Sequence, residues 1–126
     1  MTLNPHQNVT FPSNGGTAHG YLATPASGSG PGVIVIQEWW GLVGHITDLA
    51  DRFAAEGYVA LAPDFYRGAS TGEPDEAMSL MMGLAMDQAA KDIAGAAAYL
   101  DAADFTDGHG VAAVGFCMGG SLALYA

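Results

Sequence analysis

The chain has 126 residues, of which 50% are hydrophobic and 13% are charged, and its formal net charge is −10 at pH 7. This composition is typical of one globular domain (residues 1–126) with a continuous core, and it argues against long disordered segments. The negative charge makes nucleic acid and anionic membrane surfaces poor candidate partners. The apolar runs are too short for a membrane span, and no targeting segment is visible at the N-terminus. The single cysteine, Cys117, excludes an internal disulfide and a Cys-rich zinc cage, so we expect a protein of the reducing cytoplasm.

The first thirty residues alternate weakly between apolar and polar side chains, as a β-hairpin does. Val9 and Phe11 lead into residues 13–16, which have the composition of a tight turn. Tyr21 and Leu22 lie on the returning strand. The sequence therefore predicts an N-terminal hairpin.

A βαβ unit follows a loop rich in proline and glycine at residues 25–32. Residues 33–36 form a continuous β-branched run, which is typical of a parallel strand that is buried on both faces. Apolar residues at helical spacing predict a helix over residues 46–55, which ends before Gly57. Residues 58–62 then return as a second buried strand.

The next segment is rich in alanine and methionine and runs to about Ala103, with a break expected near Gly83. It predicts one long helix or two short ones. Its methionines are interpreted as adaptable core packing and not as a metal-binding stripe: Met78, Met81, Met82 and Met86. A turn at residues 107–110 precedes a third buried strand at 111–114, and residues 119–126 have the composition of a helix start. Because crossovers between parallel strands are right-handed, this order predicts an α/β fold with helices on both faces of a parallel sheet.

Cys117 is the strongest candidate for a nucleophile. It lies in Gly-Phe-Cys-Met-Gly-Gly, residues 115–120, between the third apolar strand and the next predicted helix. A sharp turn of this kind exposes the nucleophile at a helix N-terminus, where the helix dipole favours a thiolate. The backbone N–H of Met118 is then directed toward a developing oxyanion. The competing interpretation is a buried structural cysteine in a glycine-rich turn.

Glu38 is the second candidate, because it follows the first apolar strand at the edge where open α/β sheets bind ligands. Trp39 and Trp40 come next, so this carboxylate is expected to be partly removed from water and able to act as a base. A backbone N–H of this loop is where such folds find the second oxyanion donor. The competing interpretation is an exposed glutamate beside two tryptophans that cover the core.

Three segments, taken together, resemble the dienelactone hydrolase family of α/β-hydrolases. They are IQEWWGL at residues 36–42, AEGYVALAPDFY at residues 55–66 and GFCMGG at residues 115–120. The resemblance implies a three-layer α/β-hydrolase-like sheet that is incomplete on its C-terminal side. It also implies hydrolysis of ester or lactone bonds in a small molecule by a Cys-His-Asp triad, with no metal and no other cofactor.

By the same resemblance, Cys117 is the nucleophile and Glu38 is the glutamate that activates the thiol. The backbone amides of Trp39 and Met118 form the oxyanion hole. The family's triad Asp and His follow the nucleophile in sequence, so we expect both to lie beyond this chain. A homo-oligomer or a second chain would then complete the sheet.

Trp40 and Arg67 are the residues that we expect to contact the substrate. Arg67 is the only cation near the predicted site, and residues 68–88 contain no arginine, so an anionic dienelactone substrate is not expected. Among the histidines only His45 follows the Glu38 loop, and it is interpreted as an ordinary residue of a helix start. Asp64 is interpreted as a turn cap.

Two other functions remain open from the sequence. The chain could be a non-catalytic fragment that needs a partner chain. It could also be a redox-sensing thiol protein, although the sequence contains no second cysteine to resolve an oxidised Cys117.

Overall fold

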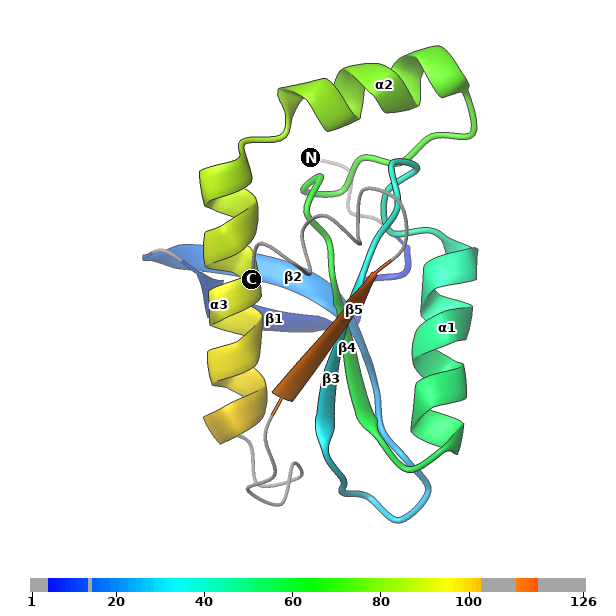
Figure 1. The fold of residues 1–126 in the computed structure, drawn as a ribbon, viewed down its shortest axis with the longest axis vertical. Coiled ribbons are helices and arrows are strands. Elements are labelled where there is room, and N and C mark those ends of the chain that lie inside the picture. The colour runs from blue at the N-terminus through cyan, green and yellow to red at the C-terminus, as the bar shows by residue number, and fades with distance from the viewer. Residues whose placement is uncertain (1–4, 14, 103–110, 116–126) are drawn as a thin grey trace.

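The computed structural model describes residues 5–13, 15–102 and 111–115. Its elements follow one another as β1 (Val9–Ser13), β2 (Gly16–Ala23), β3 (Gly32–Ile36), α1 (Gly44–Ala55), β4 (Val59–Pro63), α2 (Pro74–Gly83), α3 (Met86–Ala102) and β5 (Val111–Gly115). The five strands form one sheet in the order β1-β2-β4-β3-β5 (Figure 1). Over the described residues, no helix is both long enough and apolar enough to cross a membrane.

The predicted N-terminal hairpin is confirmed. β1 and β2 pair antiparallel, with Val9 opposite Gly20 and Ser13 opposite Gly16. Gly15 has a φ of 76°, a backbone conformation that glycine adopts at little cost. β2 then pairs antiparallel with β4, so the hairpin is joined to the parallel part of the sheet.

The predicted βαβ unit is also confirmed. All five residues of β3 and all five of β4 are buried, and the two strands pair in parallel. Between them, α1 ends at Ala55, and Gly57 follows the helix with a φ of 98° and an N–H that donates to the Ala54 carbonyl at 3.0 Å. The continuous β-branched run therefore indicated correctly a strand that is covered on both faces.

The molecule has three layers, with α1 and α3 on opposite faces of the sheet (Figure 1). Successive residues of a strand point to opposite faces, so each strand contributes to two cores. The core under α1 includes Val33, Val35, Ala60, Ala62 and Ala50. The core under α3 includes Ile34, Ile36, Leu61, Ile93 and Leu100.

The alanine- and methionine-rich segment forms two helices. The expectation that its methionines pack in the core is wrong for three of the four, whereas Met81 is half-buried. The side chains of Met78, Met82 and Met86 are 46%, 76% and 43% exposed. Figure 1 shows α2 beyond the end of the sheet at which β5 finishes, where the helix covers neither face. Ala77 is the one buried residue of α2. A methionine at helical spacing carries no information about whether its helix has a sheet to pack against.

β5 is a parallel strand, as predicted, but it is not buried. It pairs with β3 from Gly32 opposite Val111 to Ile36 opposite Gly115, and Ala112 and Ala113 are exposed. Among the described strands β5 has a partner on one side alone, which accounts for this exposure. The predicted turn at residues 107–110 and the predicted helix at residues 119–126 lie outside the described residues.

Candidate active site

The end of β3 is tied to the loop that follows β4. Gln37 is fully buried directly after β3, and its side-chain Oε1 accepts the backbone N–H of Phe65 at 3.0 Å. Burial raises the pKa of the Tyr66 phenol, and a hydrogen bond from the Gln37 side chain opposes that shift. The carboxyl ends of two neighbouring strands are therefore fixed to each other by a buried amide.

Glu38, Trp39 and Trp40 form a tight turn at this edge, and each is half-buried. The turn is closed by the N–H of Gly41, which donates to the Glu38 carbonyl at 3.1 Å. The two indole rings lie edge to face, with centroids 5.2 Å apart and an interplanar angle of 63°. Glu38 thus lies at the edge where it was predicted, beside aromatic surface.

The turn at residues 38–41 is braced from outside by the loop after β4. Gly41 and Ser70 form an isolated β-bridge, and the Thr71 N–H donates to the Trp40 carbonyl at 3.0 Å. Gly41 has a φ of 98°, and a Cβ atom there would lie 2.7 Å from the Ala69 carbonyl oxygen. Only glycine combines this backbone conformation with so close an approach.

Asp64 fixes the start of the bracing loop and is a turn cap, as interpreted from the sequence. Its Oδ1 accepts the Tyr66 N–H at 3.2 Å, and its Oδ2 accepts the Gly68 N–H at 2.8 Å and the Gln7 amide at 2.7 Å. The side chain is 1% exposed. Burial raises the pKa of Asp64, while these hydrogen bonds and the nearby Arg67 oppose the shift.

Arg67 is held by a buried carboxylate on α3. Its Nη2 donates to the Oδ1 of Asp92 at 2.8 Å, and the same oxygen accepts from Ser13 Oγ at 2.6 Å and from Gln88 Nε2 at 3.0 Å. Asp92 was not predicted from the sequence as a functional residue, because two of its hydrogen-bond partners lie 79 and 25 residues away. One feature of the sequence does indicate that Asp92 is buried: it shares the buried face of α3 with the apolar residues Ala89, Ile93, Ala96 and Leu100.

Trp40 and Arg67, both expected to contact the substrate, line different hollows. Trp40 lines an open hollow of about 440 Å³ with Val43, Ser70, Thr71 and Gly72. Arg67 lines a smaller one of about 250 Å³ beside α2, with Phe65, Tyr66, Ser79, Leu80, Gly83 and Leu84. The structure therefore does not bring these two side chains together.

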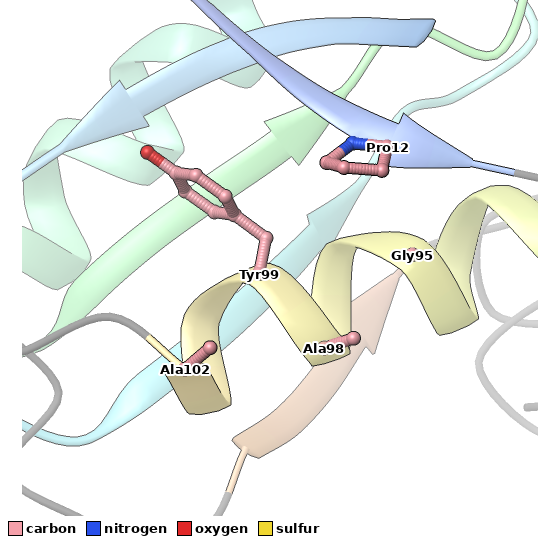
Figure 2. A pocket seen from close by; sticks show the side chains of 5 residues that line it. All are labelled: Pro12, Gly95, Ala98, Tyr99 and Ala102. Carbon is pink, nitrogen blue, oxygen red and sulfur yellow. The ribbon is translucent and has the colours of Figure 1, made fainter. Parts of the chain in front are cut away.

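A third hollow, of about 350 Å³, lies between α3 and β1 (Figure 2). It is lined by Pro12, Gly95, Ala98, Tyr99 and Ala102, so its surface is apolar apart from the Tyr99 phenol. It lies toward the end of α3 that points away from α2 (Figure 1), and it contributes nothing to the edge that carries Glu38.

His45 is exposed in the first turn of α1. The His6 imidazole lies beside Gly44, the first residue of α1, and the His19 carbonyl accepts the Asp64 N–H at 2.8 Å. His6 and His19 thus lie near this end of the sheet, because β2 runs antiparallel to β4. Within the described residues, no group of three or more His, Cys, Asp or Glu side chains is placed to hold a metal ion.

Cys117 and Met118, the predicted nucleophile and its oxyanion-hole neighbour, lie outside the described residues, and their roles stay predictions. What the structure describes is the strand that leads to them, which ends at Gly115.

Comparison with known proteins points to one family. The sequence model of the dienelactone hydrolase family matches residues 18–126. Protein usf from Aquifex pyrophilus is 44% identical over 125 residues, which cover 94% of this chain and 54% of the relative. A carboxymethylenebutenolidase from Pseudomonas sp. (strain P51) is 34% identical over 127 residues, which cover 93% and 53%.

A similar solved structure is the crystal structure of a dienelactone hydrolase-like promiscuous phosphotriesterase from metagenomic libraries. It is 30% identical, with a TM-score of 0.78, and the match covers 92% of this chain and 50% of that one. The chain thus spans about half the length of the relatives it matches.

Proposed function

Since this chain belongs to the dienelactone hydrolase family, we propose that the protein hydrolyses an ester or lactone bond of a small molecule through the thiol of Cys117. The observation that carries the proposal is the pairing register of β3 with β5. Ile36 of β3 and Gly115 of β5 are paired neighbours in parallel strands. β3 and β5 therefore end at the same edge of the sheet, and Glu38 and Cys117 each follow the pair by two residues in the sequence. Neighbouring strands are about 4.8 Å apart, which supports a direct contact between the carboxylate and the thiol.

The proposed reaction begins when Glu38 takes the proton from the Cys117 thiol. The thiolate sulfur attacks the carbonyl carbon, and the backbone N–H groups of Trp39 and Met118 stabilise the resulting oxyanion. Collapse of this intermediate expels the alcohol, which leaves with the proton held by Glu38, and an acyl-enzyme remains. A water molecule that a His-Asp pair activates then attacks the acyl-enzyme, which releases the acid and restores the thiol.

The substrate we infer is a neutral ester or lactone with an apolar group. The open hollow beside Trp40 offers aromatic and aliphatic surface next to the Glu38 turn, from Trp40 and Val43. Arg67, the nearest cation, is paired with Asp92 and faces another hollow. A free thiol persists in a reducing compartment, so we assign the protein to the cytoplasm.

A burst assay with p-nitrophenyl acetate tests the proposal. For residues 1–126 we expect at most one equivalent of p-nitrophenol per chain, then little turnover, because acylation precedes a hydrolytic step for which the described residues place no His-Asp pair at the Glu38 edge. Cys117→Ala is expected to remove the burst. A burst of unchanged size in that variant contradicts the proposal, and sustained turnover that His45→Ala abolishes would identify His45 as the base.

The role of Glu38 is tested by the rate of Cys117 alkylation with iodoacetamide as a function of pH. Glu38→Gln is expected to shift this profile toward that of a free thiol, because the proton acceptor is lost. Glu56→Gln is the matched control, since Glu56 is exposed at the end of α1. Identical profiles for the protein and for Glu38→Gln would leave Glu38 without a part in activating the thiol.

A further inference from the structure

Asp92 is a buried carboxylate that joins three parts of the fold. It is 1% exposed, and its Oδ1 accepts donors from the end of β1 (Ser13), from the loop after β4 (Arg67) and from α3 itself (Gln88). Within the described residues its Oδ2 is buried and has no hydrogen-bond partner. A buried carboxylate is tolerated when a counter-charge and hydrogen bonds compensate for the lost water. Arg67 supplies that charge, since its Nη2 lies 2.8 Å from the Oδ1 of Asp92.

The backbone of Arg67 shows that its position is enforced. Its φ of 55° lies in the left-handed region, which is unfavourable for any residue with a Cβ atom. Such a conformation persists where the surroundings hold it in place. Two attachments do so here. Asp64 binds the N–H groups of Tyr66 and Gly68 on either side of Arg67, and Asp92 binds its guanidinium group.

The loop that contains Arg67 in turn holds the turn that carries Glu38. Three residues beyond Arg67, Ser70 bridges to Gly41, and the next residue, Thr71, donates to the Trp40 carbonyl. The approach of this loop to Gly41 leaves no room for a Cβ atom, so a displacement of the loop also displaces the turn. The backbone N–H of Trp39 and the Glu38 carboxylate move with that turn.

We propose that the Arg67–Asp92 ion pair is a positioning device: it fixes the loop after β4 and thereby sets the geometry of the Glu38–Trp40 turn for acylation. Arg67 acts through the turn and does not contact the substrate. This inference rests on the proposed function for its kinetic consequence, but the placement of the turn can be measured without any reaction. It assigns to Arg67 and Asp92 a single shared role.

The experiment uses the double variant Arg67→Met/Asp92→Asn. Removal of Arg67 alone leaves a buried charge uncompensated and can prevent folding. The double variant leaves no uncompensated charge at position 92, and the asparagine Oδ1 still accepts from Ser13 and Gln88. Arg52→Met is the matched control, since Arg52 is an exposed cation in the last turn of α1.

Two measurements follow. The first is the near-UV circular dichroism and the fluorescence of the chain's two tryptophans, Trp39 and Trp40. Both residues lie in the Glu38–Trp40 turn, so these spectra report on its conformation. The second is the acylation of Cys117 by a neutral ester, p-nitrophenyl acetate, and by an anionic one, the mono-p-nitrophenyl ester of glutaric acid. For each ester the maximal acylation rate and the half-saturating concentration are determined separately.

In the double variant we expect an altered tryptophan spectrum and a maximal acylation rate lowered by about tenfold or more, by the same factor for both esters. The half-saturating concentrations are expected to stay unchanged, and Arg52→Met is expected to behave as the unmodified protein.

A folded double variant with unchanged spectra and rates overturns the proposal. So does a loss confined to the anionic ester and to its half-saturating concentration, which would make Arg67 a substrate contact. If the unmodified protein is not acylated at all, the proposed function fails, and the spectra alone decide the positioning role.

Discussion

At the scale of single residues, two buried aspartates organise the edge of the sheet. Asp64 accepts hydrogen bonds from the backbone of its own loop, and Asp92, on α3, accepts one from the side chain of Arg67. Both carboxylates are 1% exposed. In a chain with thirteen acidic residues and a net charge of −10, they act as internal acceptors, while most of the others contribute to a solvated acidic surface.

Asp64 gives a prediction about pH. Burial raises its pKa above the ordinary 3.8, so the folded protein binds this proton more tightly than the unfolded chain does. The contribution of Asp64 to the free energy of unfolding is therefore fully present below pH 3.8 and falls as the pH rises through the folded pKa. Asp64→Asn removes this contribution, so the difference in unfolding free energy between the protein and the variant should shrink with rising pH across that window.

At neutral pH the variant is still expected to be less stable by about 1–3 kcal/mol, because an amide cannot accept all three hydrogen bonds. Urea unfolding at a series of pH values measures both effects. Asp48→Asn, at an exposed position of α1, is the control. A stability difference that does not vary with pH would show that the Asp64 pKa is the same in the folded and unfolded states.

At the scale of elements, the sheet and the helices were predictable, whereas the exposure of α2 was not. β3 and β4 were recognisable as continuous apolar runs, because a strand that is buried on both faces has apolar residues at successive positions. α1 was recognisable by its periodicity, because a helix that buries one face has apolar residues at helical spacing. The pattern for α2 was equally helical, yet its methionines are exposed, because tertiary position decides burial. The ion pair of Arg67 with Asp92 joins residues 25 positions apart, a separation at which no local pattern operates.

The contact of α3 with β1 gives a second prediction. Gly95 of α3 lies near Pro12 of β1 (Figure 2). A Cβ atom at Gly95 would overlap the carbonyl oxygen of Pro12. Gly95→Ala should therefore lower the free energy of unfolding by about 1–3 kcal/mol, although alanine is the better helix former. Gly83→Ala, in α2 where a Cβ atom meets nothing, should leave stability unchanged or slightly raised. Equal effects of the two changes, measured by urea unfolding, would show that α3 does not approach β1 this closely.

At the scale of the whole molecule, the candidate site is distributed over loops that only the sheet brings together. Glu38 could be placed at the correct edge from the sequence, because a residue that follows a parallel strand lies at the carboxyl end of the sheet. The brace from residues 64–71 could not be predicted, since it depends on how two loops pack. At this scale, too, β5 lies at an edge of the described sheet.

That edge gives a prediction about association. Among the described strands β5 pairs with β3 alone, so its other side presents backbone N–H and C=O groups together with the exposed Ala112 and Ala113. We expect this chain to form a dimer or larger assembly through β5, as light scattering at tens of micromolar would show. Ala113→Lys is expected to weaken association, whereas Ala55→Lys, at an exposed position of α1, is not. A stable monomer under these conditions would show that this edge is protected in solution.

The strand order also has a consequence for the time course of folding. β1 to β4 all lie within the first 63 residues, and β4 occupies the middle of the sheet with β2 on one side and β3 on the other. The four strands and α1 can therefore assemble while the rest of the chain is still being synthesised. α3 then covers the second face, and β5 adds to the free side of β3. A sheet built in this order grows outward from a nucleus that is complete early, and β5 joins a template that already exists.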